Sequence, residues 1–244
     1  MFPLVSLPLP GEVLLITDEL LASADFLLHH FLARHLKESK DSASMIVFLS
    51  EDIGRWKAIA GKSNVNLSGH MDNQRLSLID AMSLISPALE SSTMVPLRDL
   101  YDGIRDALQN HANHREQSML VILDDLATLE WIGIAVEEVA QFSRALCALC
   151  RQRNAALVLR HHIVSPGEPD EVFKRLLQLC DYHLDVFPLS SGRSGSVSGQ
   201  VALHCGHASA EATNRLISRN AAVQYRLTDT GSTFFDRGTG NGVL

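Results

Sequence analysis

The sequence Val13-Leu-Leu-Ile-Thr17 is a short apolar run, followed by Asp18-Glu-Leu-Leu-Ala-Ser-Ala-Asp25 and then by an amphipathic stretch from Phe26 to Glu38. A run of this composition is typical of a strand that is buried on both faces of a parallel sheet. Apolar side chains spaced three and four residues apart in the last stretch predict a helix, with Asp25 or Ser23 as its N-cap. The predicted order is therefore strand, eight-residue loop and helix.

This order is the frame of a P-loop NTPase, but the loop lacks the residues that hold a phosphate. It contains no glycine, which would let backbone N–H groups approach a phosphate, and no Lys-Ser or Lys-Thr pair. It carries three carboxylates instead, at Asp18, Glu19 and Asp25, and these would repel a triphosphate. The segment predicts the fold of an ATPase without the ATP site, in a protein that works by assembling with others.

Length and composition are those of a soluble α/β protein, which we expect to form a single domain over residues 1–244. The net charge of −7 gives no general attraction to nucleic acid or to an anionic membrane, so any RNA contact must be local. No apolar run reaches the roughly 18 residues that span a bilayer, and residues 1–10 lack the basic start of a signal peptide. We therefore expect a soluble intracellular protein.

Short apolar runs alternate with helical patterns along most of the chain. Beyond the first strand, the predicted strands are Met45–Leu49, Leu76–Ile79, Met119–Leu123, Ala156–Leu159 and Tyr182–Phe187. The predicted helices between them are Asp52–Lys62, Leu97–Asn110, Gly133–Arg151 and Pro169–Cys180. This alternation predicts an α/β fold with a mostly parallel, doubly wound sheet flanked by helices.

The chain changes character after Phe187. Residues Ser190–Gly199 are rich in serine and glycine, which predicts a flexible loop. Three further strands are predicted, at Gln200–His204, Val223–Leu227 and Ser232–Phe235. We expect these strands to close the sheet in antiparallel fashion.

Ala60-Gly61-Lys62-Ser63 resembles the end of a phosphate loop but does not fit one. The glycine that the motif needs five positions before Gly61 is Trp56. The segment also follows a predicted helix, whereas a phosphate loop precedes one. We interpret Gly61 as a helix C-cap, with Lys62 near the negative end of the helix dipole.

The strand Met119–Leu123 ends in Asp124-Asp125, which resembles a Walker B strand. The carboxylate of such a strand helps to hold magnesium beside the phosphate loop, but here that loop has no phosphate to share. We favour the interpretation that both aspartates cap the next turn and helix.

Cysteine and histidine residues present two weaker candidates for chemistry. Cys147 and Cys150 have the spacing of metal ligands, which Cys180 and His183 could complete, but burial as small apolar side chains is the favoured interpretation. Arg160-His161-His162 follows another buried strand, at the edge where α/β proteins bind ligands. Ser50 and Ser165 lie in loops that could approach the histidines, but neither lies in a nucleophile elbow, so we expect a surface or interface role.

Four arginines, Arg193, Arg215, Arg219 and Arg226, lie in the serine- and glycine-rich loop and in the segments after it. A solvated surface would explain them. The sharper hypothesis is contact with an RNA backbone, since arginine forms forked hydrogen bonds with phosphate and a flexible loop can follow the strand.

Several segments, in order along the chain, resemble the Elongator complex protein 6 family. They are Met1-Phe-Pro3, Asp25–Leu32, Ile46–Leu49, Val121–Leu126, Val223–Leu227, Ser232–Phe235 and Gly242–Leu244. Of these, Val121–Leu126 resembles the degenerate Walker B strand of the family. None is a catalytic signature, so the resemblance rests on their joint order and on the empty phosphate loop.

The resemblance implies a RecA-like fold with degenerate Walker motifs and no catalytic, cofactor or metal site in this chain. It implies a subunit that pairs with Elongator proteins 4 and 5, two such heterotrimers closing into a hetero-hexameric ring. That ring is an accessory subcomplex of Elongator, which modifies the wobble uridine of transfer RNAs in the cytoplasm, with the nucleus as a further location. It is expected to bind tRNA and to respond to ATP, with the Ser190–Gly199 loop facing its opening and Arg193, Arg215 and Arg219 contacting tRNA.

Two other functions remain open on the sequence. A divergent RecA-like ATPase could be active on its own with an unorthodox loop, using Asp124 and an arginine from a partner. A degenerate α/β hydrolase would need a serine at a strand–helix elbow, and the chain contains no G-x-S-x-G motif.

Overall fold

The opening apolar run forms strand β1 (Val13–Glu19), and the amphipathic stretch forms helix α1 (Asp25–Glu38). The structure is a computed structural model that describes residues 7–39, 41–90, 96–112, 118–168, 170–192, 194–209, 216–229 and 231–237. Because β1 continues to Glu19, the loop before α1 is reduced to residues 20–24. The N-cap of α1 is Ala24, which makes no side-chain cap hydrogen bond, so the prediction of Ser23 or Asp25 is wrong.

The described strands form one nine-stranded sheet in the order β3-β2-β4-β5-β1-β6-β7-β8-β9. The strands after β1 are β2 (Ala43–Phe48), β3 (Leu76–Asp80), β4 (Met119–Leu123), β5 (Ala156–Ile163), β6 (Tyr182–Phe187), β7 (Gly199–Cys205), β8 (Val223–Thr228) and β9 (Gly231–Phe235). The strands from β3 to β6 pair in parallel, and β7, β8 and β9 are antiparallel. The predicted mostly parallel sheet with an antiparallel C-terminal end is confirmed.

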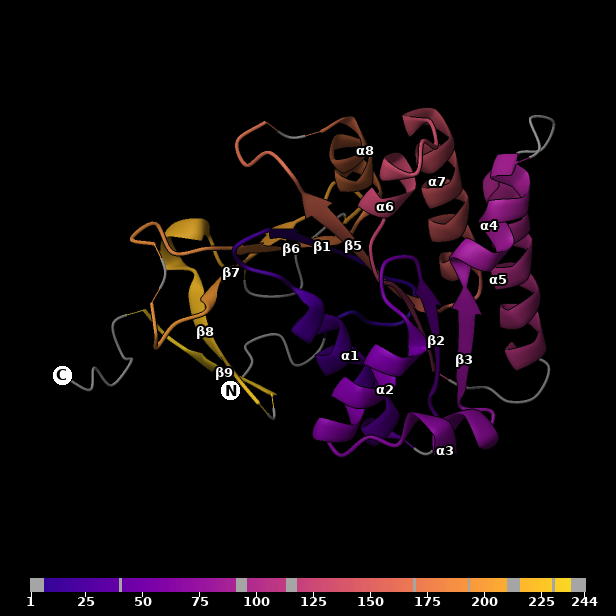
Figure 1. Ribbon diagram of the computed structural model, residues 1–244, viewed down its shortest axis with the longest axis horizontal. Coiled ribbons are helices and arrows are strands. Elements are labelled where there is room, and N and C mark those ends of the chain that lie inside the picture. Colours follow the sequence, from indigo (N-terminus) through magenta and orange to yellow (C-terminus); the bar gives the residue numbers. More distant parts are fainter. Residues whose placement is uncertain are drawn as a thin grey trace.

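Helices cover both faces of the sheet (Figure 1). One face carries α1 together with α2 (Ile53–Lys62) and α3 (Leu67–Asp72). The opposite face carries α4 (Ala81–Glu90), α5 (Pro96–Ala112), α6 (Ala127–Trp131), α7 (Val136–Gln152) and α8 (Glu171–Leu179). In the part of the chain that the structure describes, no helix combines the length and apolar character needed to cross a bilayer.

Strand β1 shows why its sequence is apolar at successive positions. Leu14 and Ile16 belong to the core under α1 and α2, where Phe31 and Trp56 are also buried. Val13 and Leu15 belong to the second core, under α5 and α7. Successive side chains of a strand point to opposite faces, so a strand covered on both sides must be apolar throughout.

The helices that sequence analysis missed are short or contain a residue that disfavours helix. Helices α3 and α6 span 6 and 5 residues, too few for a helical pattern to be recognised, and α4 contains Pro87. The end of α2 also differs from the expectation. Gly61 lies within the helix, Ser63 is the C-cap, and Asn64 takes the left-handed conformation with a φ of 57°.

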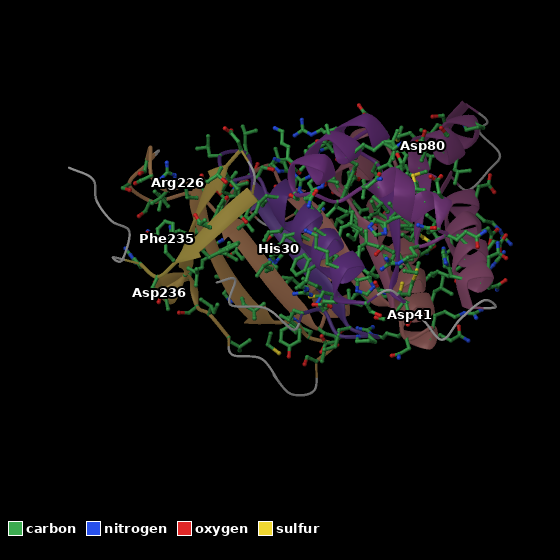
Figure 2. The ribbon with its side chains drawn as sticks, turned by 90° about the horizontal axis from the view of Figure 1, so that it is seen from below. His30, Asp41, Asp80, Arg226, Phe235 and Asp236 are labelled. Atoms are coloured by element: carbon green, nitrogen blue, oxygen red, sulfur yellow. The ribbon has the colours of Figure 1, made fainter. Side chains whose placement is uncertain are left out.

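The two edges of the sheet lie at opposite ends of the molecule (Figure 2). The figure shows Asp80, at the end of β3, far from Arg226 and Phe235 on the β8–β9 hairpin. The hairpin packs against α1, since the ring of Phe26 lies 4.5 Å from that of Tyr225. Strand β1 therefore lies in the interior of the sheet, between β5 and β6 and away from both edge strands.

Candidate functional site

Charged side chains gather at the carboxyl ends of three adjacent strands. Strands β4, β5 and β1 are neighbours and parallel, so their carboxyl ends meet at one edge of the sheet. Asp18 lies near the end of β1, Asp124 follows β4, and Arg160 lies in the second half of β5. Open α/β sheets bind ligands at this edge.

Asp18 and Arg160 form a buried ion pair. The Nη2 and Nε atoms of Arg160 lie 2.8 and 3.1 Å from Oδ2 of Asp18. The Asp18 side chain is fully buried and that of Arg160 is 9% exposed. Burial alone would raise the pKa of Asp18, but the hydrogen bond from His162 and the charge of Arg160 outweigh it and lower that pKa. Asp18 is therefore held as a carboxylate inside the protein.

Two more side chains complete this arrangement. Nη1 of Arg160 lies 2.8 Å from Oδ1 of Asp25, at the start of α1. Nδ1 of His162 lies 3.1 Å from Oδ1 of Asp18, and this hydrogen bond raises the pKa of His162. We refer to Asp18, Asp25, Arg160 and His162 as the Arg160 cluster. Two of the carboxylates expected to repel a phosphate thus bind a cation of the protein itself.

Backbone N–H groups of the β1–α1 loop are also hydrogen-bonded within the protein. The N–H of Ala24 donates to Oδ2 of Asp18 at 2.7 Å. The N–H of Asp25 donates to Oγ of Ser23 at 3.3 Å. Amides at this position would bind phosphate in a phosphate loop, so both the charge and the donors of that site are used by other groups here.

Asp124 and Asp125 have different partners. Asp124 is fully buried and accepts hydrogen bonds from the backbone N–H groups of residues 49–51, at 2.6 to 3.3 Å. Burial raises the pKa of Asp124 to about 6 despite these bonds. Asp125 accepts from the N–H of Ala127 at 3.0 Å. Asp125 thus holds the next turn as predicted, but the predicted helix cap is wrong, because the N-cap of α6 is Leu126 and makes no side-chain cap hydrogen bond. Asp124 instead fixes the connection from β2 to α2.

Exposed apolar side chains follow the ends of β1 and β5 and end α6, at the same edge of the sheet as the Arg160 cluster. They are Leu20, Leu21, Trp131 and Val164, which are 83%, 58%, 60% and 65% exposed. Leu20 and Val164 each follow directly after the paired residues Glu19 and Ile163 at the ends of β1 and β5. The ring of Trp131 lies 6.1 Å from that of His162. We call these four residues the edge patch.

The cysteines do not form the zinc site that their spacing allowed. Cys147, Cys150 and Cys180 are buried, and burial raises the pKa of the Cys147 and Cys180 thiols to about 12. His183 shares a hydrogen bond with Oγ1 of Thr17 at 2.6 Å. The burial of the three cysteines fits their interpretation as small apolar side chains, and the group of described residues with metal-ligand spacing does not include them.

Known proteins match this chain along nearly its whole length. A family model described as Elongation complex protein 6 matches residues 6–229. The chain belongs to the Elongation complex protein 6 family. It is 23% identical over 256 residues to Elongator complex protein 6 of Danio rerio, covering 96% of this chain and 94% of that protein. It is likewise 23% identical over 256 residues to that of Rattus norvegicus, covering 96% and 93%.

A solved structure with a similar fold is known for this member of the Elongation complex protein 6 family. A KaiC-like protein from Pyrococcus horikoshii superimposes with a TM-score of 0.65 and 8% sequence identity, over 93% of this chain and 90% of that one. Similarity at this identity concerns the fold alone. The predicted RecA-like architecture is confirmed.

One of the three arginines predicted to contact tRNA lies within the described chain. Arg219 binds Asp185 through Nε and Nη2, at 2.5 and 3.1 Å. Its guanidinium lies 4.7 Å from the ring centroid of Phe187, and 59% of the side chain is exposed. Burial would raise the pKa of Asp185, but hydrogen bonds from His204 and Arg219 lower it to about 2.

The other two arginines, Arg193 and Arg215, lie outside the described residues. Arg226 is described and is exposed on β8, as Figure 2 shows. The structure therefore brings Arg219 to the end of β6 but does not relate it to Arg193 or Arg215.

The members of the Arg160 cluster are each visible in the sequence, but their association is not. Asp18 and Asp25 belong to the predicted loop, and Arg160 follows a predicted strand far along the chain. The missing signal was the strand order, because only the pairing of β1 with β5 brings Arg160 beside Asp18.

Proposed function

We propose that this member of the Elongation complex protein 6 family is a non-catalytic subunit of the Elongator accessory subcomplex. In this proposal it joins Elongator proteins 4 and 5 in a hetero-hexameric RecA-like ring that supports tRNA binding and wobble-uridine modification. The observation that carries the proposal is the Arg160 cluster, which lies where a RecA-like ATPase would hold phosphate.

A triphosphate at this position would have to displace interactions that the fold uses. It would compete with Asp18 for Arg160, leaving a fully buried carboxylate without its cation. Removing one partner of a buried ion pair costs several kcal/mol, typically about 3–5. The Arg160 cluster therefore supports a structural role for this chain and a catalytic role for other subunits.

The edge patch supports assembly through the same edge of the sheet. Its four apolar side chains are more than half exposed and come from the ends of β1 and β5 and from α6, beside the elements that carry the Arg160 cluster. A contiguous exposed apolar patch is typical of a protein–protein interface, and Trp is among the residues most often at the energetic centre of one. We propose that a neighbouring subunit of the ring covers the edge patch.

Contact with tRNA is proposed for Arg193, Arg215 and Arg219. Arg219 keeps an exposed guanidinium but shares its charge with Asp185. A phosphate would gain less from an arginine already paired with a carboxylate. Within this set we therefore expect Arg219 to contribute least to tRNA affinity, and the Ser190–Gly199 loop with Arg193 to contribute more.

Assembly is tested by co-expression with Elongator proteins 4 and 5 and measurement of the intact mass. The wild type is expected in a complex with two copies of each subunit. Trp131→Asp is expected to reduce recovery of the hexamer about ten-fold or more, because it places a charge in a desolvated contact. Leu89→Asp is the matched control, since Leu89 is 42% exposed but lies on α4, away from the edge patch. Equal recovery of all three would reject the proposed interface.

The second candidate function is a divergent ATPase, which the position of Asp124 at the end of β4 favours. Purified chain should then bind magnesium-ATP and hydrolyse it without partners, and Asp124→Asn should abolish hydrolysis. For a non-catalytic subunit we expect neither binding nor hydrolysis by the chain alone.

The tRNA contact is tested in the assembled ring by Arg193→Glu. We expect weaker tRNA binding and a shallower dependence of affinity on salt, because fewer counterions are released. Arg153→Glu, at the exposed C-cap of α7 and outside the set of arginines proposed to contact RNA, is the control for a general change in charge. Unchanged affinity and salt dependence for Arg193→Glu would reject a role for this residue in RNA binding.

A further inference from the structure

Three side chains from different elements converge beside the Arg160 cluster. Glu130 lies in α6, His161 in β5, and Asp170 is the N-cap of α8. One possible ligand atom from each lies within 4.8 Å of the other two. Among the described residues this is the one group of three or more with such spacing. We call it the His161 group.

The His161 group combines a rigid member with two accessible members. His161 is fully buried in β5, and its ring stacks on Phe173 at a centroid distance of 6.4 Å. Asp170 is 35% exposed and Glu130 is half-buried. An ion could thus enter from solvent past the carboxylates and meet an imidazole whose position is fixed by packing.

The hydrogen bonds of the group leave one carboxylate unsatisfied. Nε2 of His161 donates to Oδ2 of Asp170 at 2.9 Å, and the other oxygen of Asp170 accepts from the N–H of Phe173. Among the described residues, the carboxylate of Glu130 has no hydrogen bond or ion pair, whereas its backbone carbonyl accepts from the N–H of Gly133. Burial and then the charge of Asp170 raise the pKa of Glu130. The two carboxylates therefore repel each other, and the attraction of His161 offsets this repulsion at Glu130 only in part.

We propose that Glu130, His161 and Asp170 bind one first-row divalent transition-metal ion. Imidazole and carboxylate are ligands suited to Mn²⁺, Fe²⁺, Co²⁺ and Zn²⁺. Three protein ligands leave the remaining coordination positions to water. The ion would replace the hydrogen bond between His161 and Asp170 with two metal–ligand bonds, and it would neutralise the repulsion between the carboxylates. This site is separate from the position of magnesium in a P-loop NTPase, which Asp124 would mark.

The second ring nitrogen of His161 limits the affinity of this site. Nδ1 is buried and has no hydrogen-bond partner among the described residues. Metal-binding histidines usually donate this N–H to a carboxylate or carbonyl, and loss of that partner lowers metal affinity about 10–100-fold. We therefore expect micromolar binding rather than the tighter binding of a structural metal centre.

The experiment titrates Mn²⁺ into the purified full-length chain after treatment with EDTA, and free Mn²⁺ is measured by electron paramagnetic resonance. Manganese is the probe because it prefers oxygen and imidazole ligands, so the exposed thiol of Cys205 does not compete. Glu130→Gln removes one charge at nearly constant shape. Asp170→Asn removes the other but keeps an N-cap, because asparagine caps a helix as well as aspartate does. Glu137→Gln, an exposed acid of α7, is the control.

We expect one Mn²⁺ ion per wild-type chain and an affinity about ten-fold or more weaker in both Glu130→Gln and Asp170→Asn. Glu137→Gln should bind as the wild type does. Mn²⁺ should also raise the midpoint of thermal unfolding of the wild type and leave those of the two binding-site variants unchanged. The proposal is overturned if the wild type binds Mn²⁺ only in the millimolar range, or if the two variants bind it as tightly as the wild type.

Discussion

The Arg160 cluster and the His161 group are centred on consecutive residues of β5, and they differ in how their charges are balanced. Successive side chains of a strand point to opposite faces, so Arg160 turns toward Asp18 and Asp25 whereas His161 turns toward Asp170. In the Arg160 cluster the guanidinium of Arg160 forms ion pairs with two carboxylates, those of Asp18 and Asp25. In the His161 group two carboxylates share a single imidazole.

The charges of the Arg160 cluster stabilise the fold, whereas the His161 group keeps a carboxylate that is available to bind an ion. Every charged member of the Arg160 cluster has an oppositely charged partner within the protein. The His161 group contains a carboxylate, Glu130, for which the described residues supply neither a hydrogen bond nor an ion pair. Substitutions should therefore damage stability in the first and affect ion binding in the second.

The largest effect is expected from Arg160→Met. This change leaves Asp18 buried without its cation, and it should lower the free energy of unfolding by about 3–5 kcal/mol. Urea denaturation followed by circular dichroism measures it. The double variant Asp18→Asn/Arg160→Met should recover part of the loss, since no uncompensated charge remains. A loss below about 1 kcal/mol in the single variant would mean that the pair is not buried as described.

The next effect concerns pH and Asp124. Its pKa of about 6 in the folded protein lies above the ordinary value near 3.9, so folding favours the protonated carboxyl. The stability that this gives is fully present below about pH 3.9 and is lost as the pH rises through 6. Relative to Asp124→Asn, which cannot titrate, the wild type should lose about 2–3 kcal/mol between pH 4 and 7. Parallel pH profiles of the two proteins would contradict the raised pKa.

A smaller loss is expected for Asp170→Asn without added metal. The asparagine keeps the cap of α8 but loses the charge that strengthens the hydrogen bond from His161. We expect a loss of about 1 kcal/mol in the free energy of unfolding, measured by urea denaturation. A loss as large as that of Arg160→Met would place the two groups in the same class and remove the contrast between them.

The smallest effect is expected for Glu130→Gln without metal. Glu130 is partly exposed and its carboxylate repels that of Asp170, so the amide should leave the stability unchanged within about 0.5 kcal/mol. Thermal unfolding in EDTA measures this, with Glu137→Gln beside it. A clear destabilisation would show that Glu130 has a structural partner, and this would weaken the case for an ion.

The sequence supports the fold more strongly than the sites, for a physical reason. Buried strands have a local signature, and β4 and β6 were predicted to the residue, at Met119–Leu123 and Tyr182–Phe187. The Arg160 cluster depends on which strands are neighbours, which is a property of the whole sheet. The His161 group joins residues 130, 161 and 170 from three elements, so no short motif marks it. Helix α6, which carries Glu130, is also too short to have a helical pattern.

The internal hydrogen bonds of the β1–α1 loop would make a phosphate site hard to build into this position. Reintroducing glycine and lysine into residues 20–24 would leave Asp18 bound to both Arg160 and the N–H of Ala24. Removing Asp18 alone would leave Arg160 without this buried carboxylate, and removing Arg160 alone would leave the buried Asp18 without its guanidinium partner. Each of these single substitutions gives a less stable protein. A nucleotide site is therefore reached at this position only if Asp18 and Arg160 change together.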